Sequence, residues 1–153
     1  MNSTSVAGVL LAMFLICLGT ASYSKGHLPS DELGSVVSVI DGDTVVIDLA
    51  GIEETVRLLG IDTPETAHSH RLPECFSSQA SNRMALLLPP GTAVLVQRDV
   101  EARDRYGRLL AYVERLSDGL MVNASMVERG FAASLYISPN GGLRHELAAA
   151  EGR

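Results

Sequence analysis

Residues 33–59 read LGSVVSVIDGDTVVIDLAGIEETVRLL, three apolar runs separated by two short turns. The runs alternate loosely and are rich in β-branched residues, which predicts β-strands over 33–40, 44–49 and 52–59. Asp41-Gly42-Asp43 and Ala50-Gly51 provide the turn residues between them. Because the connections are so short, the stretch predicts a meander of three strands.

The chain beyond residue 59 continues with a polar loop over 60–74 and then a helical pattern over 76–88, which Pro89-Pro90-Gly91 ends. Further patterns predict strands over 92–99 and 109–116, a charged loop over 100–107, and helices over 121–129 and 143–150. Five strands with a helix between the third and the fourth predict an α+β fold, a five-stranded OB-type β-barrel with about three helices.

The N-terminal 24 residues carry no charged side chain, and an apolar run spans residues 6–18. The run is too short for a comfortable membrane span and small residues follow it, which predicts a signal peptide over 1–22. We therefore expect a secreted or otherwise extracytoplasmic protein; an uncleaved membrane anchor is the alternative. A linker over 23–32 leads to one folded domain over 33–153, whose last helical pattern still runs at the final residue, so a truncated C-terminal helix is also open.

The composition is that of an ordinary globular domain, with 46% hydrophobic and 20% charged residues in 153. A formal net charge of −6 argues against a protein that coats nucleic acid through a broad basic surface. It leaves open an enzyme that meets a few phosphates in a small pocket. His68 and His70 have no zinc-site spacing, and Cys75 would be alone once a signal peptide is removed, so neither a zinc site nor an internal disulfide is expected.

The first cluster of polar residues lies at the first turn of the meander, near the end of its third strand and just after it. Its members are Asp41-Gly42-Asp43-Thr44, then Arg57, then Asp62-Thr63-Pro64-Glu65. In a three-strand meander, the first turn lies at the same end as the end of the third strand. We therefore expect the carboxylates of Asp43, Asp62 and Glu65 to converge at one rim of the barrel. Three carboxylates repel one another unless a cation lies among them, and oxygen ligands of this kind suit calcium.

The second cluster is Asp104-Arg105-Tyr106-Gly107-Arg108. Arg57 and Arg108 have planar guanidinium groups that can bind a phosphate with two parallel hydrogen bonds. Each motif alone has a simpler interpretation: Asp-Gly-Asp as a plain turn, the second cluster as a solvated hairpin loop, and Arg57 as a partner of Glu53 or Glu54. The joint order of the motifs is what points to a phosphate site.

That joint order, over residues 36–147, resembles the secreted bacterial type of the staphylococcal nuclease (thermonuclease) family. The resemblance implies a nuclease-like OB-fold domain and a calcium-dependent hydrolase that cuts DNA and RNA at the bond between phosphorus and the 5′ oxygen, leaving 3′-phosphates. It implies a monomer with a nucleic acid substrate and no stable protein partner. The alternative is an inactive OB-fold module that binds nucleic acid or calcium.

The resemblance also implies a role for individual residues. Asp43 and Asp62 would bind Ca²⁺ through their carboxylates and Thr63 through its backbone carbonyl. Glu65 would act through water as a general base, and Arg57 and Arg108 would grip the scissile phosphate. The residues that would contact the rest of the substrate are Arg105, Tyr106 and Tyr136.

Overall fold

The computed structural model describes residues 31–66, 72 and 74–152. The expected signal peptide, most of the expected linker, and His68 and His70 lie outside these residues. Within them, no helix is long and apolar enough to cross a membrane.

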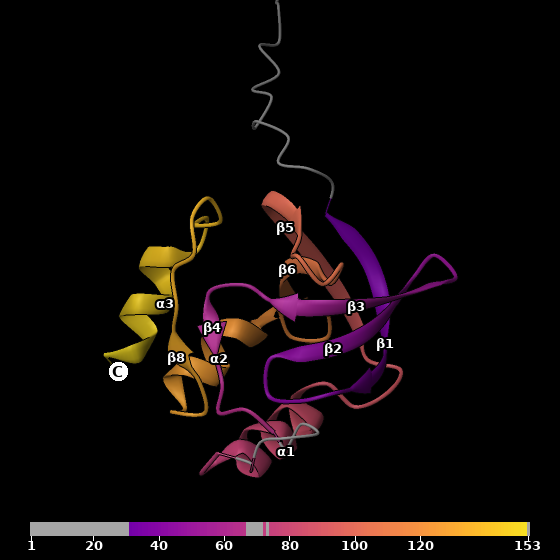
Figure 1. The fold of residues 1–153 in the computed structure, drawn as a ribbon. Coiled ribbons are helices and arrows are strands. Elements are labelled where there is room, and N and C mark those ends of the chain that lie inside the picture. Colours follow the sequence, from indigo (N-terminus) through magenta and orange to yellow (C-terminus); the bar gives the residue numbers. More distant parts are fainter. Residues whose placement is uncertain (1–30, 67–71, 73, 153) are drawn as a thin grey trace, which may run out of the picture.

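The five predicted strands and the three predicted helices are confirmed (Figure 1). The long strands are β1 (Glu32–Val39), β2 (Thr44–Leu49), β3 (Ile52–Leu58), β5 (Ala93–Arg103) and β6 (Leu109–Arg115). Three short strands accompany them: β4 (Ile61–Asp62), β7 (Leu120–Met121) and β8 (Ala133–Ser134). The helices are α1 (Ser77–Leu87), α2 (Val122–Glu128) and α3 (Arg144–Glu151).

The sheet closes into a barrel. Its strands follow the order β3-β2-β1-β5-β6-β7, and a further pairing joins β3 to β6. This closing pair is parallel, with Val56 opposite Leu109, while the other pairs of the sheet are antiparallel. Together with the helices it is the α+β, OB-type architecture that the sequence predicts.

Two boundaries differ from the prediction. Residues 100–103, expected in a loop, continue β5, because the strand passes through a register shift after Arg98 and pairs again with β6 at Arg103. The first strand also begins one residue earlier than predicted, because Glu32 pairs with Val96 and its side chain forms an ion pair with Arg98.

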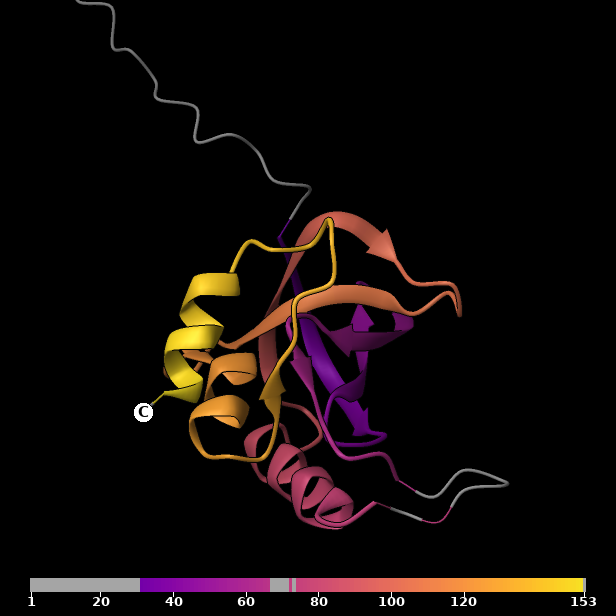
Figure 2. The ribbon, with the colours of Figure 1, turned by 60° about the vertical axis from the view of Figure 1, so that its left-hand side comes forward.

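The core fills the barrel and the space beneath the helices. Alternate residues of the strands point inward, and Val45, Ile47, Val56, Val94 and Val96 are almost fully buried. The helices cover one side and one end of the barrel, and α2 packs against both α1 and α3 (Figure 2). This packing anchors the segments that connect the barrel to the helices.

Asn123 on α2 is a buried polar link between helix and barrel. Its Oδ1 accepts a hydrogen bond from Val113 N at 2.9 Å, and its Nδ2 donates to Leu59 O at 2.8 Å. We expect Asn123→Ala to lower the free energy of unfolding by about 3 kcal/mol, because two buried backbone groups lose their partners. Urea denaturation measures this change, and Asn82→Ala on the exposed face of α1 controls for helix propensity. A cost close to that of the control would show that the two bonds add no stability.

Candidate active site

The turn between β1 and β2 brings Asp43 to the end of β3. Asp41 Oδ1 accepts a hydrogen bond from Asp43 N at 3.0 Å, and Asp43 O accepts one from Leu58 N at 2.8 Å. Position 42 must be glycine, because a Cβ there would lie 2.8 Å from the hydroxyl oxygen of Thr63. The close approach places the turn directly against the chain that follows β4.

The Asp43 carboxylate is buried among hydrogen-bond donors. Its Oδ1 accepts from the Thr44 hydroxyl at 3.1 Å, and its Oδ2 accepts from Thr63 N at 3.1 Å and from the Thr63 hydroxyl at 2.9 Å. Burial raises the pKa of Asp43 above its ordinary value, although Arg57 and Thr63 act to lower it, and the neighbouring Asp41 raises it further. One arginine therefore does not fully compensate this carboxylate, and an added cation would stabilise its charged form.

Arg57 lies between the two predicted metal-binding carboxylates. Its Nε forms an ion pair with Asp43 Oδ1 at 3.1 Å, and its Nη2 donates to Asp62 Oδ1 at 3.1 Å. Its Nη1 donates to two backbone carbonyls, Leu58 O at 2.7 Å and Ile61 O at 2.9 Å. These contacts hold the guanidinium in one orientation at the rim where the meander ends.

Asp104 organises the second cluster. Its Oδ1 accepts from the backbone N of Tyr106 at 2.9 Å and of Arg108 at 3.0 Å, and its Oδ2 accepts from Arg108 Nε at 2.7 Å. Burial raises the pKa of Asp104, but these hydrogen bonds outweigh it and leave the pKa below its ordinary value. Asp104 is thus a charged carboxylate that shapes the loop and aims Arg108, a role signalled by its place at the start of a turn.

Tyr106 lies exposed between two arginines. The guanidinium carbon of Arg105 is 4.8 Å from the centre of its ring and that of Arg108 is 5.5 Å from it. Arg105 Nη2 also donates to the Tyr106 hydroxyl at 2.6 Å. The loop therefore presents an exposed aromatic ring with two positive charges close to it.

Both clusters meet in one pocket of about 470 Å³, which we call the arginine pocket. The predicted site residues that line it are Arg57, Asp62, Arg105, Tyr106 and Arg108. Among the described residues, none accepts a hydrogen bond from the terminal nitrogens of Arg108. Two guanidinium groups that are about fifty residues apart in sequence thus line a common space of a size that suits a phosphate and an attached nucleoside.

A family model described as "Staphylococcal nuclease homologue" matches residues 55–153, which include the C-terminal half of β3 and the whole second cluster. The chain belongs to the staphylococcal nuclease family. With the arginine pocket, this membership makes it a hydrolase of the nuclease class.

Named relatives agree with this membership. A thermonuclease of Staphylococcus intermedius is 37% identical over 87% of this chain and 82% of its own length. A thermonuclease of Staphylococcus hyicus is 32% identical over 72% of this chain and 64% of its own length. An endonuclease of Bacillus subtilis (strain 168) is 38% identical over 66% of this chain, and the match spans 47% of that protein.

Glu65 lies just beyond Asp62 in this nuclease. Its side chain is exposed, and its backbone is fixed by Glu74, whose Oε2 accepts from Glu65 N at 3.1 Å and whose N donates to Glu65 O at 3.0 Å. In the described part of the chain, no group of three or more carboxylates, histidines or cysteines is arranged to hold a metal. The expected convergence of three carboxylates is therefore not seen there: Asp43 and Asp62 share Arg57, and Glu65 forms no ion pair with it.

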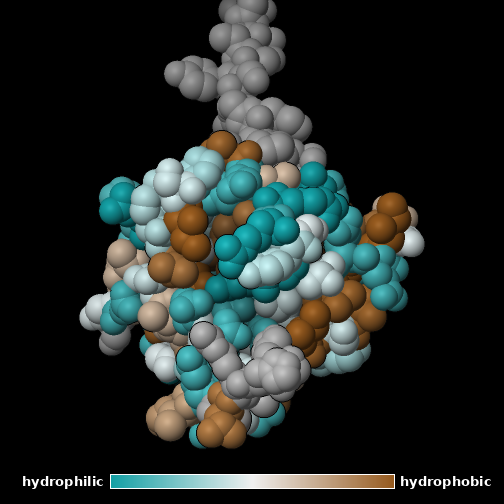
Figure 3. Space-filling model, viewed as in Figure 1, coloured by the Kyte–Doolittle hydropathy of each residue, from teal (hydrophilic) through white to brown (hydrophobic). Residues whose placement is uncertain are grey.

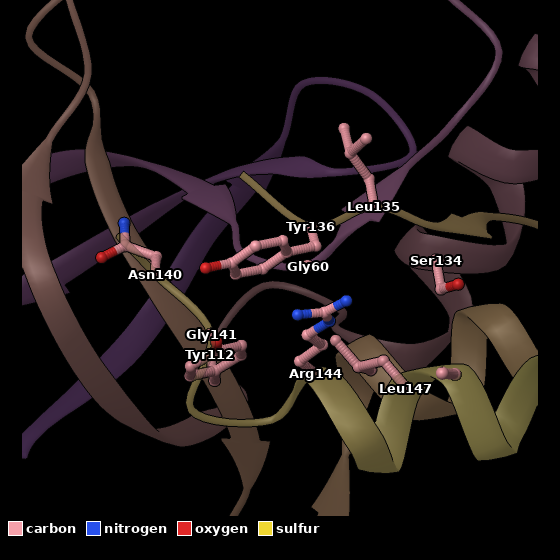
Figure 4. A pocket seen from close by; sticks show the side chains of 10 residues that line it. Gly60, Tyr112, Ser134, Leu135, Tyr136, Asn140, Gly141, Arg144 and Leu147 are labelled. Carbon is pink, nitrogen blue, oxygen red and sulfur yellow. The ribbon is translucent and has the colours of Figure 1, made fainter. Parts of the chain in front are cut away.

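Tyr136 lies outside the arginine pocket. It lines a neighbouring pocket of about 250 Å³ beside α3, where the guanidinium carbon of Arg144 is 4.4 Å from the centre of its ring (Figure 4). Figure 4 shows Leu135 leaving the chain in a different direction from Tyr136. The two neighbours of Tyr136 in the chain, Leu135 and Ile137, line the arginine pocket, and Tyr136 does not.

The arginine that pairs with Glu54 is Arg103 and not Arg57. It forms a two-pronged ion pair with Glu54, with nitrogen–oxygen distances of 2.6 and 2.8 Å. The hydrogen bond from Arg103 lowers the pKa of Glu54 below its ordinary value. Arg57 is thereby left to Asp43 and Asp62, and Arg103 does not line the arginine pocket.

The donor set around Arg57 fits a hard cation. Asp43 and Asp62 offer carboxylate oxygens and Thr63 a backbone carbonyl, which are ligand types that calcium prefers. Burial raises the pKa of Asp43, and a cation bound beside this carboxylate would stabilise its charged form. The predicted metal ligands are therefore chemically compatible with calcium.

Proposed function

We propose that this nuclease is a calcium-dependent endonuclease that hydrolyses DNA and RNA between phosphorus and the 5′ oxygen and leaves 3′-phosphates. The observation that supports this most strongly is the placement of Arg57 and Arg108 on one pocket, beside Asp62. Two guanidinium groups can each bind a non-bridging oxygen of a phosphodiester, and their charge opposes the charge that builds up during attack by water.

The roles of the chain's own residues follow from their positions. Arg57, fixed by two carbonyls and two carboxylates, orients the phosphate; Arg108, aimed by Asp104, stabilises its developing negative charge. Glu65 accepts a proton from the attacking water, whose oxygen forms a bond to phosphorus as the bond to the 5′ oxygen breaks, and the departing 5′ oxygen takes up a proton from solvent to leave as a hydroxyl. When bound by Asp43, Asp62 and the Thr63 carbonyl, calcium would add positive charge next to the same phosphate.

The test is cleavage of plasmid and single-stranded DNA, and of RNA, by purified protein with calcium and with a chelator. We expect cleavage with calcium, none with the chelator, and fragments whose 3′ ends become labelled only after phosphatase treatment. Binding without cleavage would support the alternative of an inactive module. Cleavage that leaves 5′-phosphates would contradict the proposed bond.

The predicted signal peptide bears on where the nuclease acts. The apolar run over residues 6–18 supports export, and we propose that the nuclease acts as a monomer outside the cytoplasm. Cell fractionation tests the location: activity confined to the cytoplasm would contradict it.

Calcium alone should stabilise the protein only weakly. Asp62 is exposed, and the ligands come from separate segments, so we expect millimolar calcium to raise the melting temperature by about 2 °C or less. A nucleoside 3′,5′-bisphosphate added with calcium should raise it further, because its phosphate binds Arg57 and Arg108. Thermal melting measures both shifts, and Asp62→Asn should reduce the combined one. A large shift with calcium alone would indicate a structural calcium site.

A further inference from the structure

A second groove begins on the other side of Asp62. It has a volume of about 760 Å³ and runs between the start of α1 and the segment that joins α2 to β8. We call it the Phe76 groove; its lining includes Asp62, Pro64, Phe76, Arg129, Phe131 and Ala133. Its apolar members include an aromatic residue at the start of α1, and hydrophobic surface is visible around that helix at the bottom of Figure 3.

The short pair β4–β8 separates this groove from the arginine pocket. Ile61 is paired with Ser134 and Asp62 with Ala133. Ile61 and Leu135 line the arginine pocket, whereas Ala133 lines the Phe76 groove, and Asp62 lines both. The two spaces therefore flank the carboxylate that pairs with Arg57.

Phe76 is presented to solvent at the start of α1. Its side chain is 69% exposed, and its backbone has a φ of 68°, a left-handed conformation that is uncommon for a residue with a side chain. The carbonyl of Phe76 accepts from Ala80 N at 3.0 Å, so the first turn of α1 holds this residue in place. A large exposed ring held in a costly conformation indicates a function for the ring rather than for packing.

The groove also contains charged side chains. Glu74 accepts from Glu65 N at 3.1 Å, and Glu151 accepts from the backbone N and the hydroxyl of Ser134. Among the described lining residues, Arg129 is the cation, and it is exposed. Asp62, Glu74 and Glu151 outnumber this one cation, so the groove suits the uncharged flat face of a nucleobase against Phe76 better than it suits a phosphate.

We propose that the Phe76 groove binds the base that lies on the opposite side of the scissile phosphate from the nucleotide in the arginine pocket. This inference rests on the proposed function. A strand cut internally continues in both directions from the scissile phosphate, and the groove is continuous with the site through Asp62. Stacking on Phe76 tolerates any base, since every base has a flat face.

The test uses short single-stranded DNA in which one phosphodiester can be cut and the others are methylphosphonates. Three versions carry both flanking bases, no base on the 5′ side of the cut, or no base on the 3′ side. We expect Phe76→Ala to lower kcat/KM about tenfold on the intact version. On one of the two abasic versions the variant should match the wild type within about twofold, and Tyr106→Ala should show this pattern with the other abasic version.

Two further variants keep the result interpretable. Phe76→Leu retains apolar bulk without the ring and should still lose most of the effect, with a melting temperature near that of the wild type. Leu86→Ala removes an equally exposed apolar side chain from the same helix, outside the groove, and should change kcat/KM on no substrate.

The outcomes separate this inference from the proposed function. Phe76→Ala that retains full activity on the intact substrate, while the wild type cleaves it, overturns the groove as a base site and leaves the nuclease function standing. A loss of equal size on all three substrates also overturns it, because the ring would then act on the fold and not on one base. A wild type that cleaves none of them overturns both.

Discussion

Arg108→Lys is expected to lower kcat by about 10²–10³-fold while KM changes much less. Lysine keeps the positive charge but loses the planar group through which arginine can bind a phosphate and Asp104 together. In the structure, Asp104 binds Arg108 Nε at 2.7 Å and so leaves the terminal nitrogens directed to the arginine pocket. An ammonium paired with Asp104 would have no second donor group in a fixed position for the phosphate.

Two other arginines make this experiment specific. Arg57→Lys should lower kcat similarly and should also lower the melting temperature, because Arg57 binds two backbone carbonyls as well as two carboxylates. Arg103→Lys is the matched control: Arg103 pairs with Glu54 and donates to Gly107 O, does not line the pocket, and can keep one of these contacts as lysine, so kcat should stay within about twofold of the wild type.

Steady-state kinetics on a short DNA substrate distinguishes the possible roles of Arg108. A normal kcat with a raised KM would show that Arg108 binds substrate and transition state equally, contrary to the assigned role.

The site at the meander was predictable because it depends on local connections. Once residues 33–59 are three antiparallel strands, Thr44 must lie near Arg57, and the structure pairs these two residues directly. The carboxylate of Asp43 follows from the same register. The meeting of this rim with residues 104–108 was expected from the family resemblance, and the parallel pairing of β3 with β6 is the contact that produces it.

The segment after β8 was not predictable in the same way. β8 has two residues, too few for an alternation pattern to show which side chains face the substrate. Its direction is set by distant partners: Leu135 N donates to Gly60 O at 2.9 Å, and Asp99 Oδ2 accepts from Gly142 N at 2.8 Å. The family resemblance implied that Tyr136 would contact the substrate, whereas these contacts turn Leu135 and Ile137 to the arginine pocket.

The exposed position of Glu65 makes it the clearest residue on which to test the chemical step. Glu65→Gln is expected to lower kcat by at least about 10²-fold, the usual scale for loss of a general base. The fold should be unaffected, because the contacts that fix residue 65 use its backbone and the Glu74 side chain, and the Glu65 side chain is solvent-exposed. Glutamine keeps the size of the side chain but cannot take up a proton from water.

The division of the effect between kcat and KM separates this role from a loss of substrate binding. In Glu65→Gln, kcat should fall while KM stays near the wild-type value, because the lost group acts on the attacking water and not on the bound substrate. Glu53→Gln, which changes an exposed carboxylate on β3, should behave as the wild type. Turnover of Glu65→Gln within a few-fold of the wild type would remove Glu65 from the mechanism and leave the two arginines as the main source of catalysis.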